Sequence, residues 1–370
     1  MKILILNWRD IKNPSSGGAE ILTQELASGF VKKGHVVTQI SAKFKGAKEE
    51  EIIEGVKIIR SGDPDARRLF RSVHFAAYKL YKRDFQGKVD LVIDEVHGIP
   101  FFTPFYVKEK KVALICEVAG DLWNIAVGFP FNIFGKIIEK IYPSFYKKIP
   151  VVTISESSKE EIEKNGFTKS QVKVIPMGSN SRMVSSLPKK EKEKTLIFVS
   201  RLSKTKGVVD AIKSVEILKK NIPDIMLWII GRGEAEFVVE LHRLVKDSDL
   251  KENIRFFDYV TEEKKEELLT RAHILIAPSV KEGWGLTVHE AGARGTPAVV
   301  YNVPGLKDIV KDNVNGKICQ ENNPENLSEN IQKILQDENL YNKLQKGAIS
   351  ERKKHTWSNT TNRFLEFALS

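Results

Sequence analysis

Cysteine is nearly absent from this chain of 370 residues, which carries only Cys116 and Cys319. The two lie far apart, with no CxxC spacing and no histidine-rich segment beside them, so neither a disulfide framework nor a zinc site is expected. Long apolar runs are also missing: no stretch approaches the ~20 consecutive apolar residues that a membrane-spanning helix needs. The apolar start, MKILIL, is too short for a signal peptide and is typical of a buried strand. We therefore expect a cytosolic protein.

A compact block of lysine and arginine with interleaved aromatic residues is missing as well, although the chain is basic. Lys and Arg number 59 against 48 Asp and Glu, a net charge of +11, and residues 1–185 hold 29 basic against 21 acidic residues. A basic first half favours phosphate-bearing ligands, an anionic membrane face or nucleic acid. Without the basic and aromatic pattern, no nucleic-acid partner is expected.

Short apolar runs alternate with longer segments of helical period, which is the pattern of α/β units on a parallel sheet. A helix is expected over 19–33, because Ile21, Leu22, Leu26 and Phe30 recur at three to four residues and Gly34 then ends the helix. The strands expected in the first half are Ile3–Leu6, Val36–Ile40, Val56–Ile59, Leu91–Ile93, Val112–Ile115, Val151–Thr153 and Val172–Ile175.

The pattern breaks over 176–194, PMGSNSRMVSSLPKKEKEK, which is rich in Ser, Pro and Lys and is interpreted as an interdomain linker. The chain is therefore predicted to hold two doubly wound α/β domains in tandem, over 1–180 and 181–354. Ligands of such sheets bind beyond the carboxyl ends of the strands, and two facing sheets offer a cleft. The second series of expected strands is Leu196–Val199, Met226–Ile230, Ile254–Phe257, Ile274–Ala277 and Ala298–Val300.

Pairs of glycines follow two of the expected strands. In NPSSGGAE, Gly17 and Gly18 stand before the first helix, so the backbone can approach a ligand closely and the helix N-terminus attracts negative charge. This segment is not the GxGxxG fingerprint of dinucleotide-binding proteins. In IIGRGE, Gly231 and Gly233 repeat the arrangement in the second domain. Each pair either makes room for a ligand or merely turns the chain.

Two cations follow the first strand of the second domain, in SRLSKTKG (Ser200–Gly207). Arg201 and Lys206 lie beyond the carboxyl end of a buried strand, where only a cleft or solvent awaits them. Fixed there, they can neutralise a diphosphate leaving group without a metal. The alternative is a basic surface loop.

Two carboxylates flank seven residues in EGWGLTVHE, Glu282–Glu290. Glu282 falls in a loop after the strand Ile274–Ala277, and a helix is expected to begin near Leu286 or Thr287, so that Glu290 lies about one turn inside it. In that position Glu290 can chelate the vicinal hydroxyls of a ribose, while Glu282 reaches the hydroxyls of an attached sugar.

The free backbone N–H groups from Gly285 to Thr287 would face a phosphate of the same ligand. For an isolated pair of glutamates, a solvated surface is the better interpretation. The presence of Arg201 and Lys206 in the same domain favours a ligand instead.

Together these segments resemble glycosyltransferase family 4, whose members are retaining enzymes with the GT-B architecture of two Rossmann-like domains facing a central cleft. The resemblance spans nearly the whole chain, in the expected order. It rests on GGAE near the start, RLSKTKG, EGWGLTVHEAGARGTPAVV with the family's E-x7-E pattern, and VPGLKDIVKDNVNGKI (Val303–Ile318).

The resemblance implies a role for each motif residue. Arg201 and Lys206 would bind the donor diphosphate, Glu290 would bind the ribose, and Glu282 would contact the transferred sugar. Of these, Glu282, Arg201 and Lys206 would take part in the transfer itself. It also implies that the last helix, over about 355–370, crosses back onto the first domain.

The chain departs from the family at one position. Members commonly carry a histidine after a mid-sheet strand of the first domain, facing the donor sugar, and the matching residue in VALICEVAGDLW is Cys116. His97, in DEVHGIPFFTPFY, is a candidate substitute, and the alternative for it is a neutral core or cleft-lining histidine. With Glu117, these residues are the candidate contacts to the sugar or the acceptor.

The predicted function is transfer of a sugar from a nucleotide-diphospho-sugar to a glycan, a lipid-linked acceptor or a small molecule, with retention of configuration. No acidic cluster of the DxD type stands in a suitable place, so we expect neither a metal nor another cofactor. Two alternatives stay open: a sugar-nucleotide epimerase or hydrolase of the same fold, and a non-catalytic nucleotide-sugar-binding protein.

The segment VGFPFNIFGKIIEKIYPSFYKK (127–148) mixes Phe, Ile and Tyr with lysines at 136, 140, 147 and 148. A helix here can lie on an anionic membrane and present the cleft to a lipid-linked sugar. The alternative is a core helix whose lysines cover its outer face.

Overall fold

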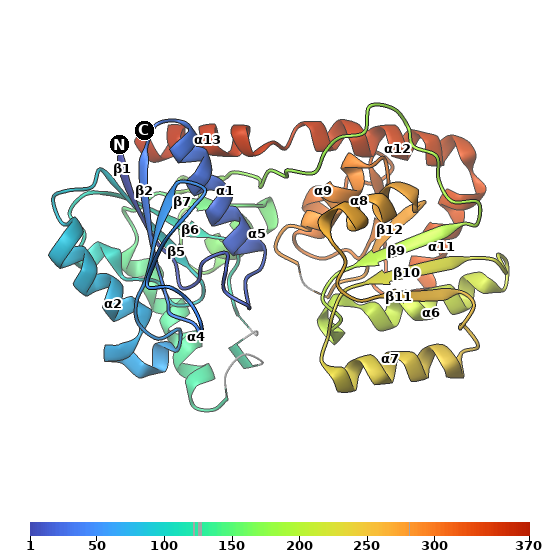
Figure 1. Ribbon diagram of the computed structural model, residues 1–370, viewed down its shortest axis with the longest axis horizontal. Coiled ribbons are helices and arrows are strands. Elements are labelled where there is room, and N and C mark those ends of the chain that lie inside the picture. Colours follow the sequence, from blue (N-terminus) through green and yellow to red (C-terminus); the bar gives the residue numbers. More distant parts are fainter. Residues whose placement is uncertain (121–122, 125–127, 281) are drawn as a thin grey trace. The chain divides into compact units, whose positions relative to one another are not determined.

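The computed structural model describes residues 1–120, 123–124, 128–280 and 282–370. The chain forms two compact units: unit 1 is Met1–Gly178 with Trp357–Ser370, and unit 2 is Ser179–Thr356. Each unit is a sheet with helices packed on it (Figure 1). Val127, the first residue of the segment predicted to meet a membrane, lies outside the described residues.

Unit 1 is built on an eight-stranded sheet with the order β3-β4-β2-β1-β5-β6-β7-β8. All its pairs are parallel except β3 with β4, which is antiparallel. Every residue of the central strand β5 is buried, as expected for a parallel strand covered on both faces. The strands are β1 (Lys2–Leu6), β2 (Val36–Ser41), β3 (Glu50–Ile53), β4 (Val56–Arg60), β5 (Leu91–Val96), β6 (Lys110–Ile115), β7 (Val151–Thr153) and β8 (Val172–Val174).

The C-terminal helix of the chain belongs to unit 1, where it packs against the first helix (Figure 1). The rings of Phe30 and Phe364 lie 5.7 Å apart, and the bare Cα of Gly29 leaves room for Thr361. The helical segments of this unit are α1 (Gly18–Lys32), η1 (Ala66–Arg71), α2 (Val73–Leu80), η2 (Tyr81–Phe85), η3 (Thr103–Phe105), α4 (Phe131–Ile141), η4 (Tyr142–Phe145), α5 (Glu156–Lys164) and α13 (Trp357–Leu369).

Unit 2 holds a six-stranded sheet with the order β11-β10-β9-β12-β13-β14, parallel throughout. The order reverses between β9 and β12, and such a switch point is where open α/β sheets bind ligands. The strands are β9 (Thr195–Val199), β10 (Met226–Ile230), β11 (Ile254–Phe257), β12 (Ile274–Ala277), β13 (Ala298–Val300) and β14 (Gly316–Ile318). The helices are η5 (Lys204–Lys206), α6 (Val208–Lys219), α7 (Ala235–Asp247), α8 (Glu262–Arg271), α9 (Leu286–Ala293), α10 (Leu306–Ile309), α11 (Pro324–Gln336) and α12 (Glu338–Lys353).

The prediction of two parallel-sheet α/β domains is confirmed, with two additional strands. Strand β3 was not expected, because EEII sits at the sheet edge with no residue fully buried and lacks an apolar run. Strand β14 was not expected because its three residues, GKI, hold a glycine and a lysine and form no apolar run.

The segment predicted as a linker, 176–194, packs largely against unit 2. The amide of Val184 donates to the Ala293 carbonyl at 3.0 Å, and the ammonium of Lys190 donates to the Thr270 carbonyl at 2.9 Å and the Thr296 hydroxyl at 2.7 Å. Its Ser-, Pro- and Lys-rich composition carries no period, yet these polar contacts fix it, and the side chain of Met177 is buried as well.

Arg352 holds both chain segments that leave unit 2. Its guanidinium donates to the carbonyl of Ser179 at 2.5 Å and to the carbonyl of His355 at 2.7 Å, and its side chain is buried. The two crossings between the units therefore begin from one fixed point at the end of α12.

Among the residues described, no helix is long and apolar enough to cross a membrane.

Candidate functional site

The glycines after β10 allow two loops of unit 2 to pack together. A Cβ on Gly231, whose φ is +147°, would lie 1.9 Å from the Ser200 carbonyl oxygen, and one on Gly233 would lie 2.4 Å from that of Leu202. The amide of Leu202 donates to the carbonyl of Arg232 at 2.8 Å. These glycines therefore fit the loop after β10 against the loop after β9, which carries Arg201 at its exposed start.

The loop after β12 also packs against the segment that follows β9. The amide of Val280 donates to the Thr205 carbonyl at 2.9 Å, and Gly207, with φ +75°, lies so close that a Cβ would meet the Pro278 carbonyl oxygen at 1.8 Å. This docking brings Lys206 and Glu282 together, 76 residues apart in the chain, with Nζ to Oε2 at 2.7 Å. Both side chains keep about a quarter of their surface exposed.

The tight turn before α9 positions the backbone amides at the start of that helix. Gly285, with φ +77°, is the N-cap residue of α9, in the left-handed region that favours glycine. The helix begins at Leu286, as predicted, so the amides of Leu286 and Thr287 fall in the first turn, where N–H groups lack partners within the helix. Gly305 packs against the carbonyl of Glu282.

Glu290 lies in the second turn of α9 and is held by a lysine of α8. Its Oε1 accepts from Lys265 at 3.0 Å, while Oε2 is buried and has no hydrogen-bond partner among the described residues. Burial raises the pKa of Glu290, and the Lys265 ammonium only partly opposes this. A buried carboxylate oxygen without a partner is costly and is suited to accept from a hydroxyl of a ligand.

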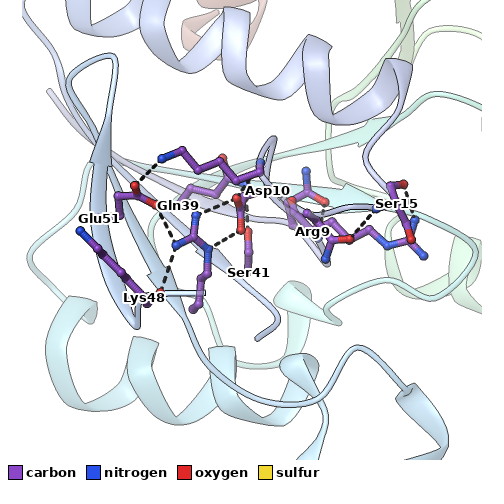
Figure 2. A network of polar contacts seen from close by, with 11 residues as sticks. Arg9, Asp10, Ser15, Gln39, Ser41, Lys48 and Glu51 are labelled. Carbon is purple, nitrogen blue, oxygen red and sulfur yellow. Dashed lines mark hydrogen bonds and ion pairs between the residues drawn. The ribbon is translucent and has the colours of Figure 1, made fainter. Parts of the chain in front are cut away.

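In unit 1, a polar network fixes the loop that leads from β1 to α1 (Figure 2). The fully buried Arg60, last residue of β4, binds Asp10 with two hydrogen bonds of 2.7 and 2.9 Å and also contacts Glu51 at 3.0 Å. The hydrogen bond to Asp10 is the main cause that raises the pKa of Arg60. From the other side, the Gln39 amide donates to the Arg9 carbonyl at 3.1 Å.

The predicted glycines Gly17 and Gly18 stand at the end of this fixed loop. The amide of Gly17 donates to the Glu20 carboxylate at 2.7 Å, which caps α1. A Cβ on Gly17 would meet only Glu20, at 3.8 Å, so packing within the described residues does not require a glycine there. This differs from Gly231 and Gly233, where packing does.

His97 and Cys116 follow the adjacent strands β5 and β6. The Nε2 atom of His97 lies 2.9 Å from Oε1 of Glu95, whose other oxygen accepts from the Thr23 hydroxyl. His97 is therefore paired with a buried carboxylate, while 17% of its side chain stays exposed. Its predicted contact with the sugar or the acceptor stays a prediction. Reasoning from the sequence missed Glu95 and Thr23, although DEVH offered a signal: residues two apart on a strand share a face.

Cys116 is buried, and Glu117 beside it is exposed. Burial, with the charges of Glu95, Glu117 and Glu20, raises the pKa of the Cys116 thiol well above its ordinary value. The thiol is therefore neutral and a weak hydrogen-bonding group. Among the described residues, no three His, Cys, Asp or Glu side chains are placed to hold a metal ion together.

Comparisons with known proteins agree with this architecture. The family model for glycosyl transferases group 1 matches residues 180–351, and the model for glycosyltransferase family 4 matches residues 16–181. The chain is a GT-B glycosyltransferase by fold and sequence. It belongs to glycosyltransferase family 4.

Two relatives from Methanocaldococcus jannaschii illustrate the match, both known only as uncharacterised glycosyltransferases. One is 26% identical over 387 residues, covering 97% of this chain and 95% of the relative. The other is 30% identical over 287 residues, covering 71% of this chain and 69% of the relative.

Solved structures share the fold over the whole chain. Sucrose-phosphate synthase of Thermosynechococcus elongatus has a TM-score of 0.79 at 18% identity and full coverage of both chains. The Anabaena protein HepE, solved in complex with UDP-glucose, has a TM-score of 0.74 at 16% identity, covering 99% of this chain and 98% of its own.

Proposed function

We propose that this glycosyltransferase moves a sugar from a nucleotide-diphospho-sugar to a glycan, lipid-linked or small-molecule acceptor, with retention of configuration. The observation that carries the proposal is Glu290, a partly buried side chain whose buried Oε2 atom has no partner among the described residues. It lies in the same loop and helix that carry Glu282 and the first-turn amides of α9. HepE, which shares the fold, was solved with UDP-glucose, and this supports a donor of that class.

In this proposal each group of unit 2 meets one part of the donor. Glu290 accepts from the ribose hydroxyls, and Arg201 and Lys206 compensate the charge of the diphosphate. The amides of Leu286 and Thr287 add hydrogen bonds to the phosphate oxygens, as helix N-termini do. Because fixed cations and amides can stabilise the leaving diphosphate, no metal is required.

The Lys206–Glu282 pair is the resting state of the donor site. An arriving diphosphate attracts the Lys206 ammonium, which releases the Glu282 carboxylate to accept from hydroxyls of the transferred sugar. Both partners are partly exposed, so exchanging one charge for another costs less than it would for a fully buried pair.

The transfer itself needs no protein nucleophile. The bond between the anomeric carbon and the diphosphate oxygen breaks, the acceptor oxygen bonds to the same face of that carbon, and the acceptor proton passes to the departing phosphate oxygen. The protein supplies position and charge stabilisation. A hydrolase or epimerase would share the donor site but transfer the sugar to no acceptor.

A direct test separates these activities. The protein is incubated with UDP-, GDP- and ADP-sugars, with and without glycan or lipid-linked acceptors, and free nucleotide and glycosylated product are measured together. Transfer supports the proposal. Nucleotide release that ignores every acceptor indicates a hydrolase, donor interconversion an epimerase, and binding without turnover a non-catalytic protein. Activity that EDTA abolishes would contradict metal independence.

We further propose that the acceptor is reached at the cytoplasmic face of a membrane, through helix α4. This helix buries only Gly135 and Glu139, and the Glu139 carboxylate fixes it by accepting from the amides of Ala119 and Gly120 at 2.7 and 2.8 Å. Ile138 is half-buried, and the remaining apolar side chains of the helix are exposed, as are apolar neighbours on both sides. They are Phe129, Phe131, Ile133, Phe134, Ile137, Ile141 and Phe145.

The exposed apolar side chains of α4 are the feature that argues against a core helix. Lys140 on the helix and Lys147 and Lys148 just beyond it are exposed as well, so the apolar face is bordered by positive charge. An apolar face with flanking lysines fits an anionic lipid surface.

A further inference from the structure

The carboxylate of Glu95 is locked in place from three elements of unit 1. It stands near the end of β5 and is fully buried, with Oε1 at 2.9 Å from His97 Nε2. Its Oε2 accepts from the hydroxyl of Thr23, on α1. That hydroxyl oxygen also accepts a hydrogen bond of 3.2 Å from the side-chain amide, Nδ2, of Asn7, which follows β1. Glu95 therefore cannot turn away from His97 without breaking buried hydrogen bonds.

His97 is restrained on its ring face as well as at its edge. The imidazole stacks on Trp8 with centroids 5.5 Å apart and an angle of 21° between the planes, and the guanidinium of Arg9 lies 3.9 Å from the centroid of the Trp8 ring. With Nε2 directed at Glu95, Nδ1 is the ring nitrogen left for a ligand, and 17% of the side chain remains exposed.

Several elements of unit 1 contribute charged groups near His97. Glu95 belongs to β5, Glu20 to α1, and Glu117 with the neutral Cys116 to the segment after β6; Arg9 is the nearby cation, behind Trp8. Burial disfavours the imidazolium, but the hydrogen bond and charge of Glu95, with the charges of Glu20 and Glu117, outweigh it and raise the pKa of His97. Burial likewise raises the pKa of Glu95. The direction of the His97 shift means that the imidazole keeps its proton to higher pH than a free imidazole would.

We propose that Glu95 is a positioning residue, held by Thr23, that fixes the orientation and the proton of His97 so that His97 Nδ1–H donates to an oxygen of the substrate. The proposal rests on the proposed glycosyl transfer and names the contact that unit 1 makes in it. The oxygen belongs either to a sugar hydroxyl or to the diphosphate, since both accept from an imidazolium.

The first test measures His97 directly and needs no enzymatic activity. The seven histidines are labelled with ¹⁵N, the His97 signals are assigned by their loss in His97→Gln, and the pKa and the protonated nitrogen are read by NMR titration. We expect a pKa above the ordinary value of about 6.5. In Glu95→Gln, which keeps the shape and can still accept from His97, proton affinity should fall at least about tenfold.

Two matched variants separate the hydrogen bond from general charge. Glu117→Gln removes the same charge without a bond to His97 and should lower its proton affinity far less. Thr23→Val removes the lock on Glu95, whereas Thr23→Ser keeps the hydroxyl, so only the valine variant should broaden or split the His97 signal. An ordinary His97 pKa that Glu95→Gln leaves unchanged would overturn the proposal.

The second test identifies the oxygen that His97 contacts. UDP, GDP and ADP are titrated first, and then the glucose conjugate of the nucleotide that binds. A shift of the His97 Nδ1 signal with the bare diphosphate indicates a phosphate oxygen, and a shift only with the conjugate indicates a sugar hydroxyl. A bound conjugate that leaves Nδ1 unchanged refutes the contact. Failure of all three nucleotides to bind contradicts the proposed function instead, and the first test then decides the role of Glu95.

The pH dependence of kcat/KM distinguishes a positioning role of Glu95 from a merely structural one. If protonated His97 assists transfer, kcat/KM falls as pH rises through its pKa, and in Glu95→Gln this basic limb moves to lower pH. A loss of activity in Glu95→Gln that is equal at every pH would indicate a structural role and count against the proposal.

Discussion

In unit 1 the carboxylate of Glu95 is fully buried and locked by Thr23 and His97, whereas in unit 2 the carboxylate of Glu282 is partly exposed and paired with Lys206 across two loops. The two units thus hold charge in different ways. The pair in unit 1 cannot rearrange without leaving a buried charge, while the pair in unit 2 can exchange one partner for a ligand. We infer that unit 1 supplies fixed orientation and unit 2 supplies the charges that respond to the donor.

The largest expected effects lie in unit 2. Glu290→Ala and Lys206→Ala should each lower turnover about 30- to 150-fold, because a lost charge-assisted contact to the donor costs ~2–3 kcal/mol. The measurement is kcat/KM with the donor that the screen identifies, together with thermal unfolding to show an intact fold. Lys264→Ala is the matched control, since this partly exposed lysine of α8 pairs with Glu267 and its loss should leave turnover unchanged. Near-full activity of both variants would mean that the donor binds elsewhere.

The next prediction contrasts one residue from each unit. Glu282→Ala should lower turnover severely, because it removes the proposed contact to the sugar and leaves Lys206 without its partner. Cys116→Ala should lower turnover less than tenfold, because the neutral thiol is a weak donor and acceptor. Both are measured as initial rates at saturating donor. Cys116→Ala that still binds the donor but has lost all activity would show a direct role of the thiol.

A smaller effect is expected on membrane binding, which concerns unit 1 alone. Binding to anionic liposomes should fall as ionic strength rises, since the Debye length is about 10 Å at 0.1 M. Replacing Lys136, Lys140, Lys147 and Lys148 by Gln should weaken it further, and Phe134→Ser with Ile137→Ser should weaken it even at low salt. Co-sedimentation with anionic and neutral vesicles measures this. Equal binding to both kinds of vesicle would favour a soluble acceptor.

The sequence predicted the fold well where a strand is a short apolar run, as in β1, β5 and β9. It expected α9 to begin near Leu286 or Thr287, and the helix begins at Leu286. It named Glu290 and Lys206 as contacts of the donor from their motifs, and these roles stay predictions. It did not predict that Lys206 meets Glu282, because that contact depends on the docking of Val280 on Thr205. Nor did it predict the Arg60–Asp10 pair, since a lone charge at the end of a strand has no local signature.

The role of Gly231 and Gly233 shows the same limit. From sequence, a glycine that makes room for a nucleotide and one that fits two loops together cannot be distinguished. Only the position of the neighbouring backbone decides, and here the Ser200 and Leu202 carbonyls occupy the space that a side chain would need. Gly17 is the opposite case, with that space largely open.

The smallest expected effect concerns Lys190, in the segment that composition indicated as a linker. Burial lowers the pKa of Lys190 to about 7, while the unfolded chain keeps it near 10.4. Between these values the unfolded state binds one more proton than the folded state, so Lys190 makes the free energy of unfolding rise with pH by at most ~1.4 kcal/mol per pH unit. Lys190→Met removes this proton, and its free energy of unfolding in urea should rise less steeply between pH 7 and 9. Lys189→Met, which alters the exposed neighbour, is the control and should keep the slope of the natural chain. If Lys190→Met and Lys189→Met gave the same slope, Lys190 would be solvated, and the segment would behave as the linker that its composition suggests.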